Sequence, residues 1–268
     1  MLTSNYHTHT YRCGHASGKD EEYVLDALSI GIRNLGFSDH IMLPGFSEPG
    51  LRGDYSLFDN YKASIESLRK KYKEQINIYF GFEAESFLYY LPYYKELVNN
   101  KVVDYLILGN HSAMNDNQEI YCSFRRITNP SQLYLYKELA ITAISSGLFS
   151  IFAHPDYFMY SIQNFDNDCK KISREIIETC IAYDVPLEIN VAGIRNGKKR
   201  IGTTTRWIYP TNDFFSIVKK YPNAKCVLGL DAHHPSQISD KGANYEAVKF
   251  AKEMGLNLVD KIDKIKSK

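Results

Sequence analysis

The chain has 268 residues, of which 44% are hydrophobic and 24% charged, and its formal net charge is +1. The near-neutral charge excludes proteins that bind long nucleic acids or anionic membranes through an overall basic field. No apolar run approaches the roughly 20 residues of a membrane span, and no basic segment followed by an apolar one opens the chain. We therefore expect a cytoplasmic protein with a single domain over residues 1–268.

Apolar segments rich in β-branched and aromatic residues alternate along the chain with helical patterns. Tyr61, Ile65, Leu68 and Tyr72 illustrate the helical periodicity, because they recur three or four residues apart. The alternation favours parallel strands joined by right-handed crossovers, and both a barrel and a doubly wound open sheet satisfy it. Seven strands are predicted, at residues 4–9, 34–40, 76–85, 103–111, 149–154, 187–191 and 226–233.

Histidines gather where the predicted strands end. The first strand ends in His7-Thr8-His9, and the two imidazoles converge because residues two apart share a strand face. Asp231 and His233 repeat this spacing in the last strand. All strand ends surround one pocket in a barrel, whereas in an open sheet only those near the switch point meet. A shared site therefore predicts an α/β fold, a seven-stranded (β/α)7 TIM-like barrel with the site at the C-terminal rim of the strands.

The side chains at these strand ends are suited to binding metal ions. Imidazole and carboxylate groups bind zinc, manganese and iron, whereas magnesium prefers oxygen ligands. Nine such donors exceed what one tetrahedral ion uses, so we expect two or three divalent ions, with Glu83 a candidate bridge. Glu85 shares the strand face of Glu83 and is expected to support a ligand or the substrate. Glu188 is either a site residue or a paired carboxylate of the barrel. The candidate metal ligands are His7, His9, His15, His40, Glu83, His111, His154, Asp231 and His233.

The five cysteines are odd in number and lack the close pairing of zinc knuckles or redox motifs. We expect them to be reduced, structural thiols, although Cys13 lies between the histidines of the first loop. His234 is expected to turn away from the pocket because its neighbour His233 faces it.

These motifs resemble the PHP family, the polymerase and histidinol phosphatase metalloenzymes, and the resemblance covers essentially the whole chain. Within that family the chain looks most like the stand-alone histidinol-phosphate phosphatases, which have this length and a similar Asn190-to-Arg195 segment. The motifs that carry the resemblance are His7-x-His9, His15, Ser38-Asp39-His40, Glu83, His111, Ala153-His154-Pro155 and Asp231-x-His233.

The resemblance implies a distorted seven-stranded barrel that holds three ions. By position in the motifs, the first ion would be held by His7, His9, Glu83 and Asp231. The second would be held by Glu83, His111 and His154, and the third by His15, His40 and His233.

The activity implied by the resemblance is hydrolysis of L-histidinol phosphate to L-histidinol and phosphate in histidine biosynthesis. Two neighbouring cations can bridge a water, lower its pKa and present a hydroxide in line with phosphorus. Asp231 could hydrogen-bond that hydroxide as well as bind metal. The leaving alkoxide needs a proton, for which His233, Asp39 and a metal-bound water are the candidates.

A phosphomonoester dianion also needs a cationic clamp, and the planar fork of arginine suits two phosphate oxygens. Arg195, in the predicted loop after the sixth strand, is the first choice. Lys198 in the same loop and Arg125 after the fourth strand are further candidates. The expected partner is a small-molecule phosphomonoester, with no nucleic acid or membrane, and the sequence leaves the oligomeric state open.

Two alternatives compete with this function. The same chemistry could act on another phosphoester, such as a nucleotide, an oligonucleotide end or a phosphotyrosine protein. The chain could instead be a non-catalytic metal-binding module that serves for docking, although the complete ligand set argues against that alternative.

Overall fold

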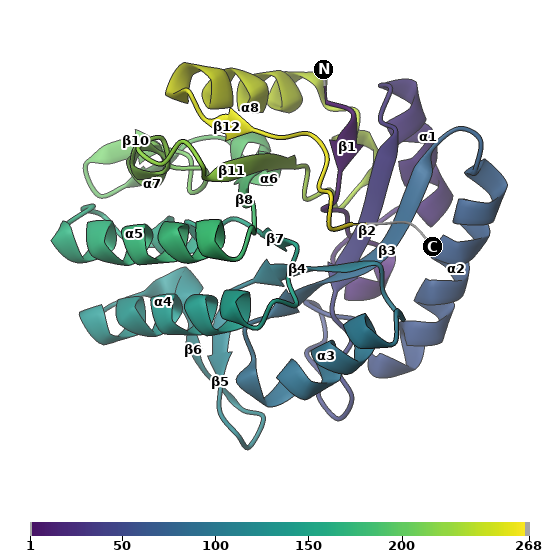
Figure 1. Ribbon diagram of the computed structural model, residues 1–268, viewed down its shortest axis with the longest axis horizontal. Helices are drawn as coiled ribbons and strands as arrows, with labels where there is room; N and C mark the ends of the chain where they lie inside the picture. The colour runs from purple at the N-terminus through teal and green to yellow at the C-terminus, as the bar shows by residue number, and fades with distance from the viewer. Residues whose placement is uncertain (1, 266–268) are drawn as a thin grey trace.

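The fold is built on one curled, parallel sheet of eight strands, with the helices arranged around its outer face (Figure 1). The computed structural model describes residues 2–265. The strands follow one another in the order β1-β2-β3-β4-β7-β8-β11-β12. Their bounds are β1 Ser4–Asn5, β2 Asn34–His40, β3 Asn77–Glu85, β4 Tyr105–Gly109, β7 Ile151–Phe152, β8 Leu187–Asn190, β11 Lys225–Gly229 and β12 Asn257–Leu258.

The helices connect these strands and cover them from outside. On α2 the predicted apolar stripe is confirmed, because Tyr61, Ile65, Leu68 and Tyr72 are its buried residues. No helix within residues 2–265 is both long enough and apolar enough to cross a membrane. The helix bounds are α1 Asp20–Ser29, α2 Phe58–Tyr72, α3 Leu91–Asn99, α4 Pro130–Ser145, α5 Asn167–Ala182, α6 Val191–Arg195, α7 Asn212–Val218 and α8 Lys241–Met254.

All seven predicted segments contain a strand, but the sheet has eight strands rather than seven. The additional strand, β12, is two exposed residues that pair with the start of β11, so its sequence carries no burial pattern. Two short hairpins were also not predicted: β5 Ser112–Met114 with β6 Ile120–Ser123, and β9 Lys199–Ile201 with β10 Thr204–Arg206. Both lie in connections between the predicted strands, where loops were expected.

The two edges of the sheet approach each other at the C-terminal ends of the strands. Thr8 forms a parallel bridge with Ala232, and the backbone N–H of His9 donates to the carbonyl of Ala232 at 2.9 Å. Below this bridge, the N–H of Leu230 donates to Oδ1 of Asn5 at 2.9 Å. The first and last predicted strand segments therefore meet, as a shared site requires.

The inner face of the sheet divides into an apolar floor and a polar rim. Along β3, Phe80 and Phe82 pack in the large outer cluster against the helices, whereas Tyr79 belongs to a smaller inner cluster. Strand alternation then places Glu83 and Glu85 on the inner face, nearer the C-terminal end. The floor beneath them consists of Tyr6, Tyr79, Tyr105, Ile107, Ile151, Ala153, Val227, Ile262 and Ile265.

Candidate metal centre

All nine predicted metal ligands converge at the C-terminal rim, above the apolar floor. The deepest of them are nearly closed to solvent: His9 is 0% exposed, His7 1% and Glu83 2%. His15 is exposed, and His111 and His233 are partly exposed. The centre is therefore open on the side of these three histidines, which is where a ligand would enter.

Glu83 lies two residues before the end of β3, in the middle of the candidate metal ligands. Its Oε2 lies 3.1 Å from Nδ1 of His40 and 3.5 Å from Nε2 of His7. Its Oε1 lies 2.9 Å from Nε2 of His154. One carboxylate thus contacts a residue from each of the three ligand sets that the sequence resemblance implies.

Donor atoms also cluster in those same three sets. Ligand atoms lie within 4.8 Å of one another in each cluster. Asp231 joins the first cluster, since its Oδ1 lies 3.4 Å from Nε2 of His7 and 3.2 Å from Nε2 of His9. Of the five clusters among residues 2–265, three match the expected sets: His7 with His9 and Glu83; Glu83 with His111 and His154; and His15 with His40 and His233. The other two are His9 with Cys13 and His233, and His40 with Glu85 and His111.

The tautomers of His15 and His233 show that this arrangement suits a cation. Nδ1 of His15 lies 3.3 Å from the carbonyl of Cys13, and Nδ1 of His233 lies 3.2 Å from the carbonyl of Asp231. A carbonyl only accepts, so each Nδ1 carries the hydrogen and each neutral ring has a lone pair on Nε2. Burial and the nearby charge of His9 lower the pKa of both rings, that of His233 to about 3, so both are neutral.

The two Nε2 atoms nevertheless lie only 2.9 Å apart. Two lone pairs at this separation repel each other unless a cation binds both. Nitrogens bound to one zinc ion at about 2.0–2.1 Å with tetrahedral angles are roughly 3.3 Å apart. The comparable Nε2 separations are 3.1 Å between His7 and His9 and 3.2 Å between His111 and His154. The residues present therefore fit divalent metal ions.

The charges of the buried carboxylates also favour binding of metal ions. Burial alone would raise the pKa of Glu83, but the imidazoles of His111, His7 and His40 lower it well below its usual range. Burial would also raise the pKa of Asp231, but His7 and His9 outweigh this effect and lower it well below its usual range. Buried anions require a positive partner.

Two of the candidate ligands have strained backbones. His154 has a φ of 30° and Asp231 a φ of 46°, both in the left-handed region that side chains other than glycine rarely adopt. Such conformations cost about 1–3 kcal/mol each and concentrate at functional sites. The strain also explains why β7 and β11 end before the ligands that follow them.

Asp39 and His40 point in different directions, as strand alternation requires. His40 faces Glu83, whereas Asp39 is fully buried behind His9 and accepts a hydrogen bond from the hydroxyl of Thr10. Oδ1 of Asp39 lies 3.6 Å from Nδ1 of His9. Asp39 is therefore placed to orient His9 and not to reach a substrate.

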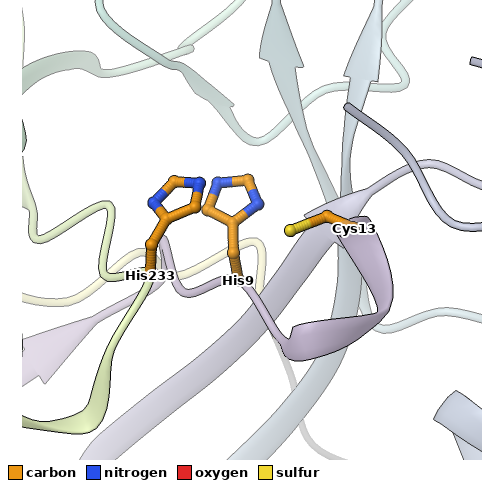
Figure 2. A group of neighbouring side chains, drawn as sticks. All are labelled: His9, Cys13 and His233. Carbon is orange, nitrogen blue, oxygen red and sulfur yellow. The ribbon is translucent and has the colours of Figure 1, made fainter. Parts of the chain in front are cut away.

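Cys13 lies closer to the centre than the sequence indicated. Figure 2 shows the rings of His9 and His233 beside each other, with the Cys13 sulfur on the far side of His9. Burial and the charge of Asp39 raise the pKa of the Cys13 thiol to about 12, so it is protonated and a poor ligand. All five cysteines are free and buried, which agrees with the expectation of reduced, structural thiols.

Comparison with known proteins decides the family. Residues 5–192 match the PHP domain family, which is more than half of the chain. The chain belongs to the PHP family. Seven of the nine candidate ligands and Asp39 lie within the matched residues, whereas Asp231 and His233 lie beyond them.

Similar proteins are known from a bacterium and a yeast, and each alignment covers at least 90% of both chains. A probable histidinol-phosphatase of Deinococcus radiodurans is 26% identical over 252 residues, which cover 93% of this chain and 92% of the relative. A probable histidinol-phosphatase of Schizosaccharomyces pombe is 24% identical over 289 residues, covering 98% and 90%. Both alignments extend past the PHP match and include the C-terminal part of the chain.

Solved structures show the same fold. The histidinol phosphate phosphatase of Lactococcus lactis, determined with zinc, L-histidinol and phosphate, superposes with a TM-score of 0.71 at 19% identity and covers 99% of this chain and 98% of its own. The putative histidinol phosphatase of Listeria monocytogenes gives 0.67 at 17% identity, covering 90% and 99%. The curled α/β sheet is thus the fold of these phosphatases.

The three basic residues predicted to bind phosphate are all engaged with other groups in this PHP protein. Arg195 ends the short helix α6, where a loop was expected, and Nη2 donates to the carbonyls of Leu230 and Gln237 at 3.1 and 3.2 Å. Arg125 donates to the hydroxyl of Tyr160 at 2.8 Å. Nζ of Lys198 lies 5.1 Å above the ring of Trp207.

Sequence reasoning missed several residues around the centre. Arg52 is 3% exposed, and its Nη2 lies 3.5 Å from Oε1 of Glu85, which in turn lies 2.7 Å from Nδ1 of His111. The rings of Tyr157 and Tyr209 lie 4.9 Å from His111 and 5.5 Å from His154. Nothing local distinguishes this arginine in its loop, or these two tyrosines among 21.

Proposed function

We propose that this PHP protein is a metal-dependent phosphomonoesterase that hydrolyses L-histidinol phosphate to L-histidinol and phosphate, a step of histidine biosynthesis. The observation that carries the proposal is the set of three donor clusters around Glu83, in one of which the Nε2 atoms of neutral His15 and His233 are directed at each other. The substrate is proposed from the two full-length relatives, which are both named probable histidinol-phosphatases.

We propose that the three clusters hold two or three divalent ions of zinc, manganese or iron. Glu83 belongs to two of these clusters. When bound, such ions supply Lewis acidity, which activates water for attack and neutralises the oxygens of the phosphoryl group. The protein's part is to keep the carboxylates ionised and to hold the imidazole nitrogens aligned within the clusters.

Asp231 is the residue that we propose to orient the attacking water. Its carboxylate is held ionised by the surrounding imidazoles, and Oδ2 accepts a hydrogen bond from Nδ2 of Asn190 at 3.1 Å. Oδ1 is directed towards His7 and His9 at the centre. A fixed, anionic acceptor can take a hydrogen bond from water and align its lone pair with phosphorus.

The leaving alkoxide takes up a proton when the bond between phosphorus and the ester oxygen breaks. His233 cannot act both as a ligand and as the donor, because Nδ1 is directed at a carbonyl and Nε2 at His15. Asp39 is fully buried behind His9. Water at the open rim is therefore the proton source that we propose among the three candidates.

Arg195 remains the proposed phosphate clamp. Its two carbonyl contacts fix it to the segment that carries Asp231, and its Nε lies 3.5 Å from Oδ2 of Asp240. A guanidinium held in this way is pre-organised for an anion. Arg125 and Lys198 stay predictions for secondary contacts with the substrate.

Replacement of Arg195 by lysine is expected to raise KM for the phosphomonoester about tenfold or more, because hydrogen bonds to charged groups contribute roughly 1.5–3 kcal/mol. The ion content should not change. Steady-state kinetics with the purified variant measure this, and Arg174→Lys on the exposed side of α5 is the matched control. An unchanged KM together with lower thermal stability would show that Arg195 only braces the backbone.

The substrate proposal is tested by phosphate release from a panel that contains histidinol phosphate, nucleoside monophosphates, a 3′-phosphorylated oligonucleotide, a phosphotyrosine peptide and an aryl phosphate. We expect kcat/KM for histidinol phosphate to exceed every other value by at least about 100-fold, which corresponds to about 2.7 kcal/mol of differential transition-state binding. A preference for another phosphoester would support the proposed phosphoesterase reaction but contradict histidinol phosphate as the substrate. No turnover of any compound would favour the docking module.

We further propose that the protein acts on a small molecule in the cytoplasm as one domain. Its free cysteines suit a reducing compartment. One sheet includes both β1, at residues 4–5, and β12, at residues 257–258, so the two ends of the chain contribute to the same fold.

A further inference from the structure

Glu188 is a buried carboxylate on β8 that lies behind the proposed metal ligands. It is 1% exposed. Oε1 lies 2.7 Å from Nδ1 of His7, and Oε2 accepts hydrogen bonds from the backbone N–H of His154 and from Nδ2 of Asn190, both at 2.9 Å. One side chain thus contacts a member of the first donor cluster and a member of the second.

The contact with His7 determines which nitrogen of that ring is free. An ionised carboxylate only accepts, so Nδ1 of His7 carries a hydrogen towards Glu188. Nε2 then has the lone pair when the ring is neutral, and it faces His9 at 3.1 Å and Glu83 at 3.5 Å. Such carboxylate–histidine pairs fix ring orientation and raise the basicity of a ligand.

The contact with His154 acts on the backbone. With a φ of 30°, His154 lies in a strained conformation for a residue with a side chain. Its N–H donates to Oε2 of Glu188, and a hydrogen bond to a carboxylate is stronger than one between neutral groups. This bond opposes the strain and keeps the imidazole directed at Glu83.

The neighbouring strand leaves room for this carboxylate. A Cβ atom added to Gly229 on β11 would lie 1.7 Å from Oε1 of Glu188, which is far inside any contact distance. β11 and β8 are paired in parallel, with Val227 opposite Glu188 and Gly229 opposite Asn190. The absence of a side chain at position 229 therefore lets Glu188 reach His7.

We propose that Glu188 is a positioning residue that couples the first and second metal ions, by holding one ligand of each in its binding geometry. The inference rests on the metal assignment of the proposed function but not on the substrate. Loss of Glu188 should weaken binding of the ions near His7 and His154, while the cluster of His15, His40 and His233 keeps its own ion.

The first test is Glu188→Gln. Glutamine has a similar shape, but its NH2 group cannot accept, so at least one of the donors from His7, His154 and Asn190 loses its acceptor. We expect zinc affinity at the coupled sites to fall about 10- to 100-fold, the usual effect of removing an outer partner of a metal ligand. Ion content per chain is measured by elemental analysis after equilibration with a graded series of competing chelators.

The second test keeps the glutamate at position 188 but displaces its carboxylate from His7. Gly229→Ala should give the same partial loss of ions, because its Cβ excludes Oε1 from its position beside His7. The matched control is Asp104→Asn, which alters a buried carboxylate at the start of β4, where Oδ2 accepts the N–H of Phe80 at 2.7 Å. Its ion content should equal that of the wild type.

His15→Ala identifies the ions that remain. This variant should lose the ion of the third cluster alone, and combination with Glu188→Gln should remove both contributions. The inference is overturned if Glu188→Gln keeps wild-type affinity for every ion, or if it loses all ions equally while remaining folded by circular dichroism. A wild-type protein that retains no zinc at all would instead overturn the metal assignment itself.

Discussion

Replacing Glu83 with glutamine is expected to reduce phosphate release by about 100-fold or more at saturating zinc, since stabilisation of transition-state charge by metal ions amounts to several kcal/mol. The two oxygens of Glu83 approach all three donor clusters, through His7, His40 and His154. A neutral amide removes the charge that balances two neighbouring cations and directs an NH2 group at one of them. Initial rates with histidinol phosphate and ion content per chain measure the two effects.

The matched control for this variant is Glu74→Gln. The side chain of Glu74 is 84% exposed and pairs with its neighbour Lys73 at 3.6 Å, so its substitution should leave the rate and ion content unchanged. Circular dichroism of Glu83→Gln should retain the wild-type spectrum, because the apolar clusters on both faces of the sheet do not depend on Glu83. A folded Glu83→Gln protein that keeps more than about a tenth of the wild-type rate would exclude Glu83 as a bridging ligand.

Removal of divalent ions by a chelator is expected to abolish turnover and to destabilise the protein. An ion present at about 100 times its Kd stabilises the folded state by about 2.7 kcal/mol per site, so loss of two or three ions lowers the free energy of unfolding by several kcal/mol. Phosphate release and the thermal midpoint are followed before chelation, after it, and after zinc or manganese is added back. Both quantities should recover with these ions.

Magnesium is the informative control, because seven of the nine proposed ligands are imidazoles and magnesium prefers oxygen. It should restore little of either quantity. A metal-stripped, folded sample that hydrolyses substrate at the full rate would refute a metal-dependent mechanism. Recovery of stability by zinc without turnover of any phosphoester would favour a docking module.

The grouping of the candidate ligands was partly predictable from sequence because it depends on local spacing. His7 and His9 are two residues apart, as are Asp231 and His233, and in an extended chain this spacing alone directs both side chains to one face. The structure brings both pairs together with Asp231 3.2 Å from His9. Strand alternation also correctly left one inward position for Asp39 and His40, although it did not decide which residue takes it.

Predictions that depended on long-range contacts were less accurate. Arg195 was assigned to a loop, but it ends α6 and bonds to carbonyls 35 and 42 residues later in the chain. The strand β12 was not predicted, since two exposed residues become a strand only because β11 offers a free edge beside them. Neither arrangement has a local sequence signal.

Spacing over a few residues was enough to predict the alternation of strands and helices, the PHP motifs and the candidate ligands. The folded chain was needed to show that Thr8 meets Ala232, that His15 and His233 direct lone pairs at each other, and that Glu188 contacts both His7 and His154. These contacts join residues far apart in the chain. They arise from the curvature of the sheet, which no local pattern encodes.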